Sequence, residues 1–492
     1  MSESAEAERH RPAYTLEDDL GPDPPSIEDL FGGDLSELSE SESEASLFGD
    51  GDREGLEASE APSELGKENG SNDDCDSDYC PECISKPSKK ATTIPRPSFT
   101  VSSTSLTTSA QSQTSSSSPR QKASNVRRRV RRQRQKALAR ELWGTEPSEH
   151  ARDVVLRRSD PVKVGFAADR FAVAKGAHTG KPGTKTDLVD ATRVYSLKEL
   201  QAQGFRHIAW DGITPSPILD EEGRVIAALC GRPQTADYVE AMDGVFNAIL
   251  SEGQNVPPPL EGGHRRGGFR AYNIGVAMGM GSASPVALDN KSMAPVLARL
   301  VGHRGVRRLA AYQNAAFALW APRLHGEYQH AMDDMYQEKL DLPQNFPGVF
   351  SAATFNFGGD VWTFKHRDHF NWAFGWCFVT ALGRFDARAG GQLILWELKL
   401  VVDFPHAATV ALPSAAITHS NIPVLKGHQR VSFTQYTAGA IFRWRENGFR
   451  TEKQLKAEDA QAYEEAMRRK DSAFQQRLSL YSTLEELLSS EL

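Results

Sequence analysis

The residues best suited to chemistry in this 492-residue chain are two histidines, an aspartate and an arginine in its last third. His366 and Asp368 are two residues apart, so on an extended segment their side chains point the same way and can reach one ion together. With His419 they would form a three-ligand face, which leaves open positions on a metal and suits non-haem Fe(II). Arg430 lies 11 residues after His419 and can hold a carboxylate through two parallel hydrogen bonds. Ser432, two residues on, is predicted to add a hydroxyl donor on the same face.

Each of these residues also has an ordinary structural interpretation. A lone His-x-Asp pair is common at turns and surfaces, and Arg430 alone could be a charge at the edge of a barrel. His369 and His406 are alternative candidates for the ligand roles, although His406 follows Pro405 at a predicted turn and is expected to be solvated. The metal prediction therefore depends on the order and spacing of all four residues together.

Four aromatic residues flank the ligand candidates. They could exclude water from a metal site, or they could be plain core residues, and the sequence does not separate these interpretations. They are Trp362, Trp372, Phe374 and Trp376.

The block that carries these residues, 346–450, is predicted to be a β-rich core. Its apolar runs are short and are separated by Gly, Pro and Asp. The predicted strands are 349–357, 376–382, 392–396, 400–404, 409–412 and 431–436. Strands at this spacing favour an antiparallel sandwich or barrel.

Mixed and helical segments flank this core, so we predict an α+β fold. Residues 150–345 are expected to form a mixed α/β part of the catalytic region, and residues 451–492 a C-terminal helix. Within the mixed part, the predicted elements are helices over 195–205, 237–250 and, as two or three helices, 293–335, a hairpin over 217–229 and a strand over 208–213.

Residues 1–140 lack the apolar side chains that a core needs, and we predict that they are disordered. They comprise an acidic segment (1–83), a Ser/Thr-rich segment (93–118) and a basic run (126–136). A basic run of this kind is typical of a nuclear-localisation or nucleic-acid-binding segment, although it could also be a solvated helix face. We therefore expect a nuclear protein. Arginines that could contact phosphates elsewhere in the chain are Arg265, Arg266, Arg304, Arg307 and Arg308.

Composition excludes several other classes of protein. The five cysteines are few and odd in number, which favours a reducing compartment over a disulfide framework. One CxxC, Cys80 to Cys83, lacks the second pair that a structural zinc site needs. Apolar runs stay well short of the 18 or so residues that a membrane span requires, and the first residues are too polar for a signal peptide.

The order of these motifs resembles that of Fe(II)- and 2-oxoglutarate-dependent dioxygenases, and more narrowly the TET/JBP branch with its expanded, transposon-associated fungal members. The resemblance covers roughly residues 150–455 and is specific in about 345–445. It implies a double-stranded β-helix, or jelly-roll, core in which His366, Asp368 and His419 bind Fe(II). It also implies that Arg430 and Ser432 bind 2-oxoglutarate. The runs 419–423 (His-Ser-Asn-Ile-Pro) and 390–391 (Gly-Gly) agree with the fungal pattern.

The same resemblance implies methylated DNA as the substrate, with 5-methylcytosine as the base, and O2 as co-substrate. Asn371 matches the position of a side chain that contacts the target base, and Tyr436 that of an aromatic residue that stacks on it. The family usually has a histidine eight residues after the arginine, and here that residue is Ala438. We therefore expect the base to be recognised differently, or another base to be accepted. The Cys-rich zinc region of TET proteins is absent from the sequence.

Two other functions stay open on sequence alone. An enzyme with the same chemistry could act on a protein side chain, but many such enzymes use Lys where this chain has Arg430. The chain could also be a transposon-derived nuclear DNA-binding protein without turnover. The intact set of ligand candidates argues against that interpretation, because a dead site need not keep all three.

Overall fold

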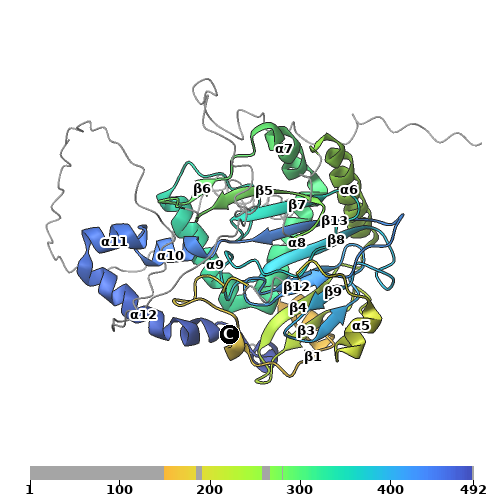
Figure 1. The fold of residues 1–492 in the computed structure, drawn as a ribbon, viewed down its shortest axis with the longest axis horizontal. Coiled ribbons are helices and arrows are strands. Elements are labelled where there is room, and N and C mark those ends of the chain that lie inside the picture. Colours follow the sequence, from red (N-terminus) through yellow and green to blue (C-terminus); the bar gives the residue numbers. More distant parts are fainter. Residues whose placement is uncertain (1–148, 184–190, 258–265, 280, 490–492) are drawn as a thin grey trace, which may run out of the picture. The chain divides into compact units, whose positions relative to one another are not determined.

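The computed structural model describes residues 149–183, 191–257, 266–279 and 281–489 (Figure 1). The helices are α3 (Glu149–Arg157), η1 (Ala168–Arg170), α5 (Leu197–Ala202), α6 (Ala236–Glu252), η2 (Gly253–Asn255), η3 (Lys291–Met293), α7 (Ala294–Gly302), α8 (Arg304–Trp320), α9 (Pro322–Glu338), α10 (Gly439–Glu446), α11 (Glu452–Glu458), α12 (Ala460–Leu478) and α13 (Leu484–Ser489). The strands are β1 (Val162–Lys163), β2 (Arg206–Ile208), β3 (Ser216–Leu219), β4 (Val225–Gly231), β5 (Arg270–Ala277), β6 (Val286–Ala287), β7 (Ala352–Phe357), β8 (Cys377–Arg384), β9 (Leu393–Leu395), β10 (Leu400–Val402), β11 (Thr409–Leu412), β12 (His419–Asn421) and β13 (Gln429–Tyr436). The prediction of disorder over 1–140 lies outside the described residues, as do the basic run and the CxxC motif.

The described chain is a mixed α and β structure with two sheets. The larger sheet has nine strands in the order β1-β3-β4-β11-β8-β13-β7-β5-β6, and the smaller has four in the order β12-β9-β10-β2. All six strands predicted over 349–436 are present. Strands of the 150–345 segment extend the same sheets, because β4 pairs with β11, β5 with β7 and β2 with β10. Figure 1 shows β5, β7, β13 and β8 side by side. The mixed segment is therefore continuous with the sheets of the predicted core.

Side chains along the central strands of the larger sheet point alternately to its two faces, and the two faces have different surroundings. On β13, Val431 and Phe433 pack with Phe355 of β7 against helices α6, α7 and α8. Arg430 and Ser432, which alternate with these two residues along β13, are buried as well but face the opposite way. The covering helices bury their apolar side chains at helical spacing, which is why the predictions over 237–250 and 293–335 are confirmed as α6 to α9.

The smaller sheet is covered on its outer face by α5. Leu200 of this helix and the following Phe205 pack on Ile394 of β9 and Val401 of β10. The helix predicted over 195–205 is present as the shorter α5, which begins after Ser196, where the Ser196 and Glu199 side chains form a reciprocal capping box. The strand predicted over 208–213 is wrong beyond Ile208. There the Asp211 carboxylate accepts hydrogen bonds from two following backbone amides, both at 2.7 Å, and turns the chain.

The segment predicted as one C-terminal helix contains three, α11, α12 and α13. The first begins at a capping box on Thr451. It ends at Asp459, whose side chain then caps α12 by accepting from the Ala462 amide at 2.9 Å. One aspartate therefore breaks the helical pattern while keeping both neighbours helical. None of the described helices combines the length and apolar character that a bilayer crossing needs.

Candidate metal centre

The two histidines are brought together by an isolated pair of backbone hydrogen bonds. The His366 amide donates to the His419 carbonyl at 3.0 Å, and the His419 amide donates back at 2.9 Å. The residues that form such a reciprocal antiparallel pair carry their side chains on the same face, so the imidazole rings lie 4.3 Å apart between centroids. His419 opens the edge strand β12, whereas His366 belongs to no strand.

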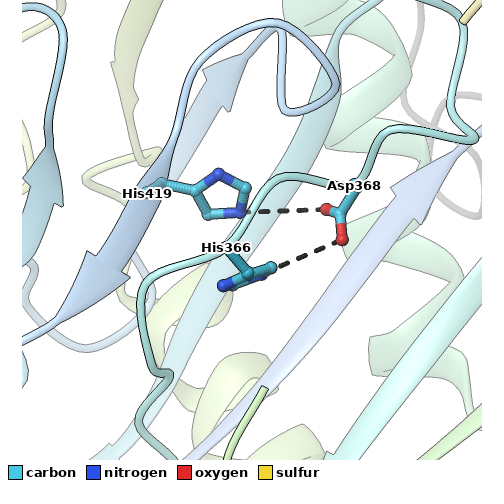
Figure 2. Close-up of side chains that lie close together, drawn as sticks. All are labelled: His366, Asp368 and His419. Atoms are coloured by element: carbon cyan, nitrogen blue, oxygen red, sulfur yellow. Dashed lines mark ion pairs between the residues drawn. The ribbon is translucent and has the colours of Figure 1, made fainter. Parts of the chain in front are cut away.

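Asp368 completes the cluster from the loop that follows His366. Its amide donates to the Ser414 carbonyl at 3.0 Å, which fixes the backbone of this loop. One carboxylate oxygen lies 3.8 Å from His366 Nε2, and the other lies 3.8 Å from His419 Nε2. Figure 2 shows the three side chains pointing toward one another, and one potential ligand atom from each lies within 4.8 Å of the others.

The hydrogen bonds of the imidazoles fit a metal. His366 Nδ1 lies 2.7 Å from the Phe364 carbonyl, and His419 Nδ1 lies 3.1 Å from the Ile417 carbonyl. A carbonyl only accepts, so each Nδ1 carries the proton and each Nε2 keeps its lone pair facing Asp368. Metal-binding histidines are oriented in this way by a partner on their second nitrogen. Two neutral nitrogens and one carboxylate oxygen form a donor set that suits Fe(II).

The charge state of His366 agrees with this assignment. Burial is the main cause that lowers its pKa well below the ordinary value, and the neighbouring His419 lowers it further. The Asp368 carboxylate raises the pKa, but by less than burial lowers it. His366 is therefore neutral at physiological pH, which is the protonation state of a metal ligand.

Arg430 is buried in β13 without an acidic partner in the described part of the chain. Its side chain is 2% exposed, Nη1 donates to the Val361 carbonyl at 2.7 Å, and Nε has no hydrogen-bond partner among the described residues. Burial lowers its pKa to about 10, so the guanidinium still carries its charge at neutral pH. A buried charge is costly unless it is paired, which indicates that an anion belongs beside it.

The surroundings of Arg430 leave space for that anion. Gly391 has a φ of +79°, and a Cβ at this position would lie 3.3 Å from Arg430 Cδ, so a side chain there would be strained and would crowd the guanidinium. Ser432, the next residue on the same face, accepts a hydrogen bond from Asn356 Nδ2 at 2.9 Å. Because the amide occupies an Oγ lone pair, the Ser432 hydroxyl proton can point elsewhere and donate to a ligand.

All seven predicted site residues line one cavity between the two sheets. From the larger sheet come Arg430, Ser432 and Tyr436, and from the smaller sheet comes His419. The intervening loop contributes His366, Asp368 and Asn371. The Asn371 amide donates to Ser414 Oγ at 3.1 Å, and Tyr436 is largely buried at the end of β13. The structure therefore places the metal, cosubstrate and substrate candidates around a single space.

Several polar residues of this cavity were not predicted as site residues. Arg266 was expected to contact phosphates, but its Nη1 lies 3.7 Å from Asp368 Oδ1. Thr354 and Asn356 alternate with apolar residues along β7, and this pattern could have identified them as inward-facing. Arg266 has no comparable sequence signal, since only the fold brings it to the loop. The other cavity residues missed by the sequence are Asn273, Thr363, Asn421 and Thr434.

The alternative candidates lie elsewhere. His406 was expected to be solvated, but it is largely buried and Nδ1 accepts a hydrogen bond from the Gly383 amide at 2.9 Å. His369 does not line the cavity. Of the four flanking aromatics, Trp372, Phe374 and Trp376 belong to the hydrophobic core, which favours their structural interpretation. The apolar walls of the cavity are instead Phe269, Val361, Phe370, Val379, Leu393, Phe404 and Leu412.

The predicted phosphate-contacting arginines differ in their surroundings. Arg308 pairs with Asp237 at 2.7 Å, and Arg304 and Arg307 lie with it on the first turns of α8. Arg265 lies outside the described residues. Their role as a DNA-binding group stays a prediction.

Comparisons with known proteins add a faint likeness in fold. No family model matches the sequence. No curated protein matches it either. Among solved structures, the chain is similar to NgTET1 in complex with 5mC DNA, with 12% identity and a TM-score of 0.35 over 52% of this chain and 91% of that one. It is also similar to an oxidoreductase of the 2OG-Fe(II) oxygenase family from Burkholderia pseudomallei, with 14% identity and a TM-score of 0.23 over 42% and 91% of the chains. Both TM-scores are too low to assign a fold or a function to this chain by themselves.

Proposed function

We propose that this protein is an Fe(II)- and 2-oxoglutarate-dependent dioxygenase that oxidises 5-methylcytosine in DNA, in the nucleus. The observation that carries the proposal is the pairing of two features in one cavity. Three potential ligand atoms lie within 4.8 Å of one another, and a buried guanidinium without an acidic partner lines the same space. The two facing sheets would then be the two halves of a double-stranded β-helix.

In this proposal, one group of residues binds the iron and another binds the cosubstrate. His366, Asp368 and His419 would hold the iron, and Arg430 with Ser432 would hold a carboxylate of 2-oxoglutarate. Bound iron would activate O2, the oxidant, so that one oxygen atom goes to 2-oxoglutarate, which becomes succinate and CO2, and the other goes to the methyl group. The protein positions the reactants and excludes water through the apolar walls of the cavity.

The substrate side of the cavity suits an unstacked base. A base inside a duplex cannot reach buried ligands, so it must be flipped out, at a cost of a few kcal/mol. Phe370 lines the cavity yet is 37% exposed, so it lies at the mouth, where an aromatic ring can stack on a base. Asn371 and Tyr436 lie further inside and would contact the edge and face of the base.

The test is mass spectrometry of nucleosides after the protein is incubated with methylated DNA, Fe(II), ascorbate and 2-oxoglutarate. We expect oxidised 5-methylcytosine and an equivalent amount of succinate. Unmethylated DNA of the same sequence and the Asp368→Asn variant are the controls, and neither should give an oxidised base.

The two products separate the proposal from its alternatives. Succinate without any oxidised base, on DNA or RNA, would overturn the nucleic-acid substrate and favour a protein side chain. If neither succinate nor oxidised base forms with Fe(II) present, the dioxygenase proposal fails and a non-catalytic binding protein is favoured.

A further inference from the structure

A second cavity lies behind the metal-bearing loop. It measures about 290 Å³ and is lined by α9, α10, α12, the turn at 176–178 and Trp372. It shares no described lining residue with the metal cavity. For scale, a cavity of ~150 Å³ in an engineered protein takes up benzene, so this one has room for a small organic or inorganic ion.

Two buried hydrogen-bond donors of this cavity have no partner. Trp372 is 2% exposed and Asn447 is 7% exposed, and neither Trp372 Nε1 nor Asn447 Nδ2 has a hydrogen-bond partner among the described residues. Leaving such groups buried without a hydrogen bond is unfavourable. Both groups donate, so the missing partner must supply acceptor atoms.

The charged residues around these donors leave a positive surplus. Arg477 is held by Glu446 at 2.7 Å, and Lys470 is held by Glu452 at 3.0 Å. The third acid of the cavity, Glu327, lies 3.7 Å from Arg445, which does not line the cavity.

Two cavity arginines remain once those pairs are set aside. Arg443 reaches Glu452 only at 4.0 Å, and Lys470 already holds that carboxylate. Arg469 makes no ion pair with a described residue and is exposed on α12. The lining of the cavity therefore combines two buried donors without a partner with two arginines beyond its close ion pairs, and this combination favours an oxyanion over a neutral or cationic ligand.

We propose that this cavity is a binding site for a small oxyanion, a phosphate or carboxylate group, which accepts hydrogen bonds from Trp372 and Asn447 and is neutralised by Arg443 and Arg469. The site is distinct from the metal cavity, and its occupation requires neither iron nor 2-oxoglutarate.

The site touches the backbone that carries the substrate residues. Trp372 directly follows Asn371, and its amide donates to the Thr437 carbonyl at 3.0 Å, next to Tyr436. Its ring stacks on Phe442 of α10, with centroids 4.1 Å apart. An anion on the indole would therefore bind one residue away from the proposed base contact.

The test is isothermal titration calorimetry of the full chain, without iron or 2-oxoglutarate, using inorganic phosphate and, separately, acetate. We expect saturable binding of at least one probe, and the preferred probe identifies a phosphate-bearing or a carboxylate ligand. Trp372→Phe and Asn447→Leu should each weaken binding about tenfold or more, because each removes a hydrogen bond to a charged group. Arg469→Gln, on an exposed helix face that should still fold, should weaken it as well.

Two control variants make the result specific. Trp444→Phe removes an indole that is also buried and unpartnered but does not line the cavity, so its binding should equal that of the wild type. Arg430→Met removes the proposed carboxylate anchor of the metal cavity, and saturable binding of the probe should persist in this variant, which excludes that anchor as its only site. No saturable binding of either probe, or equal binding by Trp372→Phe, Asn447→Leu and wild type, overturns the proposal. Neither outcome depends on whether the protein is an oxygenase.

Discussion

The two ends of the metal cavity differ in how the charges of their side chains are balanced. At the metal end, each imidazole is fixed by a backbone carbonyl, and the Asp368 carboxylate lies near two imidazoles and the Arg266 guanidinium. At the anchor end, the buried Arg430 donates one hydrogen bond to the Val361 carbonyl, and its Nε has no hydrogen-bond partner among the described residues. The metal end is compensated before any ligand binds, whereas the Arg430 charge at the anchor end has no acidic partner among the described residues and lies only near the rings of Phe385 and Phe404, at 5.8 and 5.5 Å.

Because of this difference, we expect the metal end and the anchor end to respond differently to mutation. Loss of a metal-end side chain should remove turnover with little effect on folding. Loss of the anchor charge should weaken binding of the cosubstrate and stabilise the fold, because burying an unpaired charge costs free energy.

The largest expected effect is that of Asp368→Ala. It should reduce succinate formation to background, because two histidines alone do not make the three-ligand face. The unfolding temperature should stay within a few degrees of the wild type, because Asp368 lies in a loop and its side chain is only partly buried. Asp360→Asn, an exposed acid before the same loop, is the control and should keep full turnover. Normal turnover by Asp368→Ala would show that the metal assignment is wrong.

The next effect in size is that of Arg430→Met. The concentration of 2-oxoglutarate for half-maximal turnover should rise about 100-fold, which corresponds to ~2.7 kcal/mol. Without 2-oxoglutarate, the variant should be more stable than the wild type by roughly 1 kcal/mol or more, as seen when other buried charges are replaced by apolar side chains. Steady-state kinetics and thermal unfolding measure the two effects.

Arg384→Met is the matched control for this prediction, since Arg384 is exposed at the end of the neighbouring strand β8. It should change neither quantity. A destabilised Arg430→Met variant with an unchanged 2-oxoglutarate requirement would mean that the arginine is structural.

The smallest effects are expected for the residues that assist the anchor. Ser432→Ala should raise the 2-oxoglutarate requirement about tenfold, since a hydrogen bond to a charged carboxylate contributes ~1.5 kcal/mol. Asn356→Leu should have a smaller effect, because it acts by orienting the serine. The double variant should then be no worse than Ser432→Ala alone, and additive effects would show that Asn356 binds the ligand itself.

The strand-borne half of the site was more predictable than the loop-borne half. Along β13, Arg430 and Ser432 face inward because a strand alternates its side chains, and the sequence shows this period. The position of His366 depends on backbone hydrogen bonds to distant segments, among them the bridge to His419, which no local pattern encodes. The same holds for Arg266, which reaches Asp368 only through the fold. Helix ends set by a side chain, such as Asp459, were visible only once the capping bond was known.

The isolated bridge between His366 and His419 also bears on how iron would enter and leave. The two residues are 53 positions apart, and the backbone bridge between them is isolated, with one further backbone hydrogen bond beside it, from the Asn421 amide to the Thr363 carbonyl at 2.9 Å. Such a contact can open locally without unfolding the sheets. A metal bound by both imidazoles would cross-link His366 and His419 and so close the 53-residue stretch of chain between them. We therefore expect the rate at which the ion exchanges and the rate of hydrogen exchange of the His366 and His419 amides to depend on the same local opening of the bridge.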